Sequence, residues 1–114
     1  MTSNILVKNF DQDGVMSEKP NAKLSVVELL TGKATRLTLE PGWRWSTDIA
    51  PLVGTATCEV HHLGFIASGT VTVAHSGQEV SYSAGEVYEI NAGHDAWVVG
   101  DTPVVAYEFS GSWA

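Results

Sequence analysis

Short runs in which hydrophobic and polar residues alternate dominate the sequence. Clear examples are LSVVELL (24–30), TRLTLE (35–40), TVTVAH (70–75) and PVVAYEF (103–109). A period of two with many β-branched and aromatic residues predicts strands with one buried face. Helical periodicity is hard to find, and turn-forming residues separate most of these runs. The pattern therefore predicts an all-β protein of about nine strands, arranged as an antiparallel sandwich or barrel.

Three further segments are assigned from the same pattern. EVSYS (79–83) is expected to pair with TVTVAH across a tight turn that contains Ser76 and Gly77. WRWS (43–46) is expected to be a strand that places its two tryptophans on one face. TATCEVHHLGFIAS (55–68) is interpreted as one or two strands interrupted near its glycine.

Composition narrows the class of protein and of partner. The 114 residues are 44% hydrophobic and 17% charged, which is typical of one globular domain. The formal net charge of −7 argues against a nucleic acid or an anionic membrane as the partner. The single cysteine excludes a disulfide within the chain, and neither a signal peptide nor a membrane-spanning stretch is evident. We therefore expect a cytoplasmic protein, with an N-terminal arm or first edge strand over residues 1–23 and a β-barrel over 24–114.

The order of glycines and strands in the second half of the chain resembles the cupin motif. A strand ends at Gly69, a hairpin follows, and Gly85 introduces EVYEINAGHDAW (86–97). This order is similar to the two halves of the motif in small single-domain cupins, and in particular to a subgroup with a GHDAW motif and no assigned reaction. The resemblance implies a jelly-roll barrel, a small-molecule ligand and a homodimer, but this fold carries many unrelated reactions.

The metal-ligand positions of the cupin motif hold other residues in this chain. The resemblance implies two histidines, a glutamate and a further histidine as ligands. Those four positions fall on Ala56, Cys58, His62 and Ala96. A metal would therefore need a different ligand set.

Such a set is available in Cys58, His62 and His94. On an unbroken strand, Cys58 and His62 project to one face while His61 projects to the other, so that His61 is an alternative ligand only if the strand bulges. In the cupin barrel, the motif positions that residues 58 and 62 occupy point inward. His94 lies two residues before Ala96, which stands at a ligand position of the motif but cannot bind a metal. A Cys-His-His set with one open position suits zinc best, with copper and nickel as alternatives. Iron is less favoured because its usual triad needs a carboxylate.

Other interpretations of the same residues remain open. A buried cysteine is commonly a small hydrophobic residue, and His94 with Asp95 can simply hold a turn. Cys58 is also a candidate nucleophile beside His62. Against this, no third residue that would orient the histidine is recognisable, and burial in an apolar barrel is expected to raise the thiol pKa.

Aromatic residues supply the candidate ligand pocket. We expect Trp43, Trp45, Tyr88 and Trp97 to line the barrel mouth, where rings and a few polar groups bind small molecules; the alternative is that they fill the core or an interface. The sequence thus favours a cupin that binds a small polar molecule, with a divalent metal held by Cys58, His62 and His94. The alternatives are a metal-free binding or sensing module with an aromatic pocket, and a scaffold for protein interactions.

Overall fold

The part of the chain that the structure describes folds into two antiparallel β-sheets and two short helices. The computed structural model describes residues 4–111. The elements, in chain order, are β1 (Val15–Lys19), β2 (Ala22–Glu28), β3 (Lys33–Leu39), α1 (Trp45–Asp48), α2 (Ala50–Val53), β4 (His62–Ser68), β5 (Thr70–His75), β6 (Gln78–Ser83), β7 (Val87–Ile90), β8 (Asp95–Val98) and β9 (Val104–Ser110). The strand order is β1-β2-β3-β9-β4-β7 in one sheet and β6-β5-β8 in the other. The prediction of an all-β jelly roll is confirmed.

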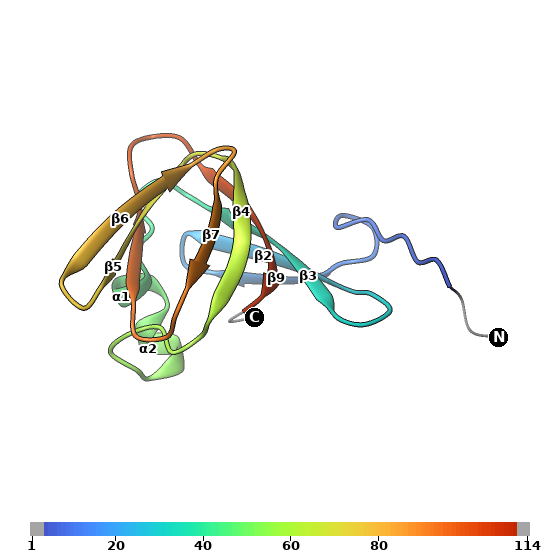
Figure 1. The fold of residues 1–114 in the computed structure, drawn as a ribbon, viewed down its shortest axis with the longest axis horizontal. Coiled ribbons are helices and arrows are strands. Elements are labelled where there is room, and N and C mark those ends of the chain that lie inside the picture. The colour runs from blue at the N-terminus through green and yellow to red at the C-terminus, as the bar shows by residue number, and fades with distance from the viewer. Residues whose placement is uncertain (1–3, 112–114) are drawn as a thin grey trace.

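The hydrophobic core lies between the two sheets, since both contribute to one cluster of buried side chains. Figure 1 shows the helices α1 and α2 at one end of the barrel, while the hairpin of β2 and β3 extends away from it. Neither helix of the described chain, residues 4–111, is long and apolar enough to cross a membrane.

The hairpin of β5 and β6 is the one expected from the sequence. His75 pairs with Gln78, so that Ser76 and Gly77 form a two-residue turn. Both turn residues have positive φ angles, of 51° and 79°, as a tight hairpin turn requires.

The prediction of a strand over WRWS was wrong. Arg44 makes a single bridge with Trp97, and the chain then enters helix α1 at Trp45. The helix is favoured because the Asp95 carboxylate accepts hydrogen bonds from the Ser46 backbone N–H (3.0 Å) and hydroxyl (2.8 Å), which provides a partner for one of the free N–H groups at the helix start. Trp43 and Trp45 are nonetheless both buried.

The segment before β4 also differs from the expected strand. Residues 59–61 are irregular, and regular pairing begins only at His62. Cys58 forms an isolated bridge with His94 instead. Within β4, alternate residues from His62 onward face the interior, as the period of two predicts.

Gly64 makes room for a polar side chain inside the barrel. It lies on β4 opposite Glu108 of β9, at a shift in register. A Cβ atom at position 64 would lie 2.9 Å from Cγ of Glu108 and would collide with the backbone carbonyl of Tyr107. The absence of a side chain at Gly64 therefore lets the Glu108 side chain pack against the strand.

The segment predicted as an arm or edge strand contains β1, which forms one edge of the larger sheet. The residues that precede β1 lead away from the barrel (Figure 1). They are connected to the sheet by an Arg36–Asp11 ion pair of 2.6 Å and by a hydrogen bond of 2.6 Å from the Ser25 hydroxyl to the Phe10 carbonyl.

Candidate metal centre

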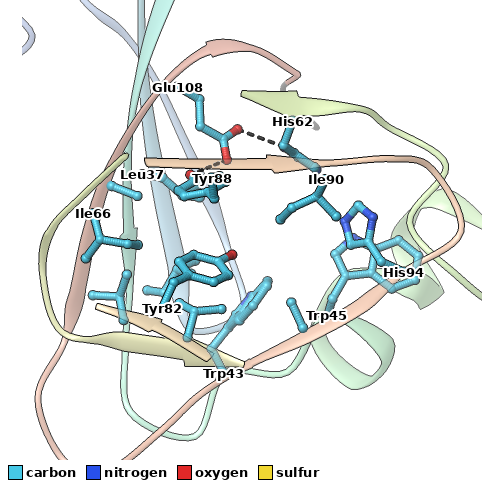
Figure 2. A pocket seen from close by; sticks show the side chains of 15 residues that line it. Leu37, Trp43, Trp45, His62, Ile66, Tyr82, Tyr88, Ile90, His94 and Glu108 are labelled. Atoms are coloured by element: carbon cyan, nitrogen blue, oxygen red, sulfur yellow. Dashed lines mark hydrogen bonds and ion pairs between the residues drawn. The ribbon is translucent and has the colours of Figure 1, made fainter. Parts of the chain in front are cut away.

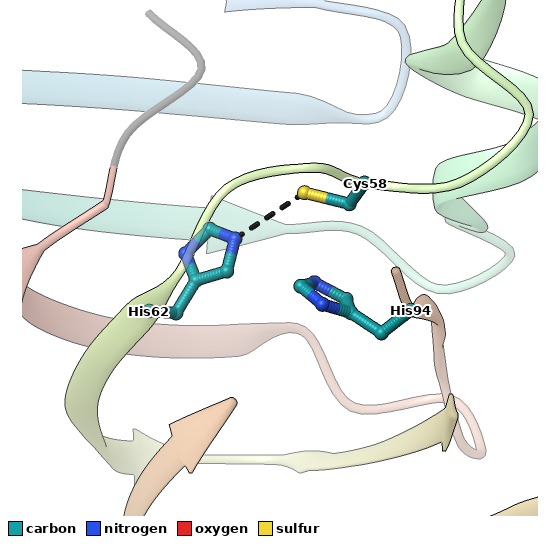
Figure 3. Close-up of side chains that lie close together, drawn as sticks. All are labelled: Cys58, His62 and His94. Atoms are coloured by element: carbon teal, nitrogen blue, oxygen red, sulfur yellow. Dashed lines mark hydrogen bonds between the residues drawn. The ribbon is translucent and has the colours of Figure 1, made fainter. Parts of the chain in front are cut away.

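The three predicted ligands, Cys58, His62 and His94, lie together inside the barrel. Cys58 and His62 come from one continuous stretch of chain and His94 from another, and the three side chains point toward one another (Figure 3). One potential ligand atom from each residue lies within 4.8 Å of the other two. Sγ of Cys58 is 3.4 Å from Nε2 of His62, and the two imidazole rings are 5.2 Å apart between centroids. All three residues are buried, with exposed fractions of 1%, 4% and 3%.

Backbone hydrogen bonds hold two of the three residues opposite each other. The N–H of Cys58 donates to the carbonyl of His94 at 2.8 Å, and the N–H of Gly93 donates to the carbonyl of Cys58 at 2.7 Å. His62 begins β4 and pairs with Ile90 of β7. The cluster is therefore built on main-chain pairing between neighbouring segments.

Nδ1 of both His62 and His94 already has a hydrogen-bond partner. Nδ1 of His94 lies 2.8 Å from the carbonyl oxygen of Asn91, and Nδ1 of His62 lies 2.8 Å from a carboxylate oxygen of Glu108. A carbonyl only accepts, so Nδ1 of His94 donates to it, and Nε2 is the nitrogen left to interact with the cluster. Histidines that bind metals commonly donate their second N–H to a carbonyl or carboxylate in this way.

Glu108 is a residue next to the cluster that the sequence analysis did not identify. It is buried in β9, and its second carboxylate oxygen accepts a 2.6 Å hydrogen bond from the Tyr88 hydroxyl (Figure 2). Burial, and then the charge of Glu108, raise the pKa of Tyr88, which keeps that hydroxyl protonated as a donor. A signal was present in the sequence: Glu108 shares the parity of Val104 and Ala106, which are buried on the same strand.

The thiol and the imidazole strongly affect each other's ionisation. Burial raises the pKa of Cys58, but hydrogen bonds with His62 and His94 outweigh it and lower the pKa from 9.0 to about 6. Burial lowers the pKa of His62, but Cys58 and Glu108 outweigh it and raise the pKa to about 9. The expectation of a raised thiol pKa was therefore wrong, because it did not take these hydrogen bonds into account. Both pKa shifts favour the charged pair, a thiolate beside an imidazolium.

His61, the alternative ligand, lies outside this cluster. Its side chain is exposed and bonds to the Glu89 carboxylate at 3.0 Å and to the Ser110 hydroxyl at 3.4 Å. Adjacent residues of an extended chain project to opposite faces, which explains why only His62 points inward. Asp95, the carboxylate nearest in sequence to His94, bonds to Ser46 and Arg44 instead.

Three of the four predicted aromatic residues line an interior cavity. Trp43, Trp45 and Tyr88 contribute to its wall, together with His62 and His94 of the cluster (Figure 2). The cavity has a volume of about 30 Å³, which is room for one or two waters. Trp97 is not part of this wall. The guanidinium of Arg44 lies over the Trp97 ring, with its Cζ atom 4.2 Å from the ring centroid.

Comparisons with known proteins agree with this architecture. The sequence matches no family model, and no curated protein is significantly similar to it. Among solved structures, KdgF from Halomonas sp. superposes with a TM-score of 0.62 and 19% identity over 96% of each chain. The Cnp3 cupin domain of Schizosaccharomyces pombe gives 0.59 and 10% identity, over 86% of this chain and 69% of that one.

A mutant of Bacillus subtilis oxalate decarboxylase OxdC is also similar, with a TM-score of 0.56 and 21% identity. The match covers 88% of the present chain, which spans only 28% of the decarboxylase chain. At these identities the likeness concerns the fold alone. Two antiparallel sheets around a shared interior, together with these likenesses, show that the chain has the cupin fold.

Proposed function

We propose that this cupin binds a divalent metal, zinc in the first place, through Cys58, His62 and His94, and that a small polar molecule binds at the remaining coordination position. The observation that carries the proposal is the convergence of three buried ligand atoms within 4.8 Å of one another, with Nδ1 of both imidazoles already bonded elsewhere. Thiolate and imidazole ligands suit a tetrahedral zinc site in which three protein ligands leave one position open.

The thiolate and imidazole ligands also determine which metals other than zinc would suit the site. Copper and nickel accept thiolate and imidazole, so they remain alternatives to zinc. Iron is disfavoured because the cluster contains no carboxylate and the Glu108 oxygens bond to His62 and Tyr88. When bound, the metal would polarise a carbonyl group or activate a water molecule.

Elemental analysis of the purified protein tests this proposal. We expect about one equivalent of zinc per chain, removed by a chelator and restored on adding zinc. A protein that stays metal-free through purification and reconstitution with zinc, copper and nickel would overturn it. The metal-free binding or sensing module with an aromatic pocket would then be favoured, and a thermal-shift screen of small ligands would test that function.

The pKa values of the cluster predict how metal affinity depends on pH. A metal ligand must be deprotonated, so the imidazolium of His62 has to lose its proton on binding. Since the pKa of Cys58 is about 6 and that of His62 about 9, binding should release one proton between these values. The association constant for zinc should rise about tenfold per pH unit over this range and level off above it. Competition titrations at fixed pH measure this slope; an affinity that stays constant from pH 6 to 9 would contradict the assignment of His62 as a ligand.

A second candidate function uses the same residues without a metal. His62 lies between Cys58 and Glu108, as a base does between a nucleophile and an orienting carboxylate. This arrangement provides the third residue that the sequence analysis did not find. Iodoacetamide should then alkylate Cys58 in metal-free protein near neutral pH, and stoichiometric zinc should prevent the reaction. Equal alkylation with and without zinc would favour the nucleophile over the metal site.

The first three residues of the sequence motif GHDAW each have an identifiable place in the structure. His94 joins the cluster, Asp95 binds the start of α1, and Gly93 has a φ angle of 96° that favours glycine. We infer that the motif marks a subgroup of small cupins in which a histidine at this position replaces the usual second-half ligand. We also place the protein in the cytoplasm, because a thiolate ligand requires a reduced Cys58.

We further propose a homodimer formed through the outer face of the larger sheet. Aromatic side chains gather there on β4 and β9, with Phe65 stacked on Tyr107 at 5.4 Å and next to Phe109 at 6.4 Å. Phe109 is 59% exposed, and Val87, the cross-strand partner of Phe65, is 75% exposed. Contiguous exposed apolar surface of this kind commonly marks an interface.

Light scattering after size exclusion tests the dimer. The Phe109→Glu variant should elute as a monomer, because a charge in an apolar interface is costly. Leu52→Glu, at a similarly exposed apolar site on α2, should remain dimeric. A wild-type protein that is monomeric at micromolar concentration would contradict this part of the proposal.

A further inference from the structure

A second and larger cleft lies between strands β6 and β7. Strand β6 is an edge of the smaller sheet and β7 is an edge of the larger sheet, and within residues 4–111 neither pairs with a strand beyond it. The cleft has a volume of about 430 Å³, compared with about 30 Å³ for the cavity beside the metal cluster. Pockets of about 300–1,000 Å³ commonly bind small organic molecules.

The wall of this cleft is apolar and aromatic. Tyr82 of β6 and Tyr88 and Ile90 of β7 contribute to it. The rings of Tyr82 and Tyr88 lie next to each other, with 4.7 Å between their centroids (Figure 2). Val80 pairs with the buried Val73 and therefore points to the same face of the sheet, yet it is 52% exposed. The inner face of β6 is thus open at the cleft, where an apolar group can pack on it.

The charged residues of the cleft are acidic. Glu86 and Glu89 line it, and no lysine or arginine among residues 4–111 does. All six lysines and arginines of the chain lie at or before Arg44, whereas the cleft is lined by residues between 73 and 91. A cleft lined by one sign of charge raises the local concentration of the opposite ion, so that it favours a cation and disfavours an anion.

Internal contacts fix both carboxylates and leave each an oxygen for a ligand. Oε1 of Glu86 accepts a hydrogen bond of 2.9 Å from the Ser83 N–H. Oε2 of Glu89 lies 3.0 Å from Nε2 of His61. The second oxygen of each carboxylate can accept from an external donor. The faces of tyrosine rings attract cations as well.

We propose that the cleft between β6 and β7 binds a small organic cation that carries a primary ammonium group on a flat hydrophobic body. The flat body packs on Val80 and Tyr82, and the ammonium group lies at the exposed carboxylates of Glu86 and Glu89. The three residues of the metal cluster do not line this cleft, so the site is independent of the proposed metal.

Nuclear magnetic resonance titrations at pH 8 test the inference with three probes that share one ring. Benzylammonium is cationic, benzyl alcohol is neutral and benzoate is anionic. Benzylammonium should bind in the millimolar range and shift the backbone amide signals of β6 and β7. Benzyl alcohol should bind at least about threefold more weakly and benzoate at least about tenfold more weakly. Raising the salt concentration should weaken the binding of benzylammonium and not that of benzyl alcohol, because salt screens exposed charges.

Two variants test the residues that form the cleft. Val80→Trp should abolish binding of benzylammonium, because the larger side chain fills the cleft. The matched control is Leu52→Trp at a similarly exposed apolar position outside the cleft, which should bind as the wild type does. Glu86→Gln keeps an acceptor for the Ser83 N–H but lacks the charge, so it should weaken benzylammonium about threefold and leave benzyl alcohol unchanged.

Each outcome supports or overturns a stated part of the inference. Benzoate or benzyl alcohol that binds as tightly as benzylammonium would overturn the preference for a cation. Signal shifts confined to residues outside β6 and β7, or unchanged binding in Val80→Trp, would overturn the site. Should Val80→Trp fail to fold, the position of the shifted signals and the Glu86→Gln titration decide the question.

Discussion

Replacing His62 with alanine is expected to abolish stoichiometric zinc binding, while replacing its neighbour His61 with alanine leaves zinc bound. Both changes remove an imidazole, but His62 points into the cluster and His61 points outward to Glu89. Zinc sites in small proteins are worth on the order of 10 kcal/mol, so the loss of one of three protein ligands should lower the association constant at least about 100-fold. Competition with a chromophoric chelator measures the constant for both variants.

The same experiment on Cys58→Ser and His94→Ala tests the rest of the cluster. Each should lose zinc to a similar extent, because all three ligand atoms lie within 4.8 Å of one another. Far-UV circular dichroism of the metal-free variants controls for unfolding. Zinc affinity that falls as much in His61→Ala as in His62→Ala would contradict the assigned ligand set.

Replacing Glu108 with glutamine is expected to have the second largest effect. The carboxylate orients His62 through Nδ1 and accepts from the Tyr88 hydroxyl at the same time. An amide has a single acceptor oxygen, so one of these two donors loses its partner. Loss of such an outer partner commonly lowers metal affinity 10- to 100-fold, and the unsatisfied buried group should cost about 1–3 kcal/mol of stability.

Chelator competition and urea denaturation measure these two quantities. The matched control is Glu89→Gln, which alters the exposed partner of His61 and should change neither quantity measurably. Tyr88→Phe keeps the bond between Glu108 and His62, so it should lower zinc affinity less than Glu108→Gln does. An unchanged zinc affinity in Glu108→Gln would show that the carboxylate does not support the ligand.

The strands that alternate regularly were predictable, because a single buried face imposes a period of two. Residues 70–83 fold into the expected hairpin, and the alternating segment 103–109 becomes most of β9. Trp45 was assigned to a strand because alternation over four residues does not distinguish a strand from the start of a helix. The Asp95 carboxylate that favours helix α1 comes from 49 residues further along the chain, and no local pattern reveals it.

Cys58, His62 and His94 lie together as expected, but the argument that predicted this was incomplete. Parity on an unbroken strand was the reason for placing Cys58 and His62 on one face, yet the chain between them is not a regular strand. Cys58 is positioned by its pairing with His94, a contact between distant segments. Glu108 was missed because a charged residue at an inward position is unusual, and its partners His62 and Tyr88 are distant in sequence.

X-ray absorption at the zinc edge of the reconstituted protein examines the coordination shell itself. The account predicts one sulfur at about 2.3 Å and two imidazole nitrogens at about 2.0–2.1 Å, with a lighter atom in the fourth position. A shell without sulfur, or one that is unaltered in Cys58→Ser, would show that zinc binds elsewhere.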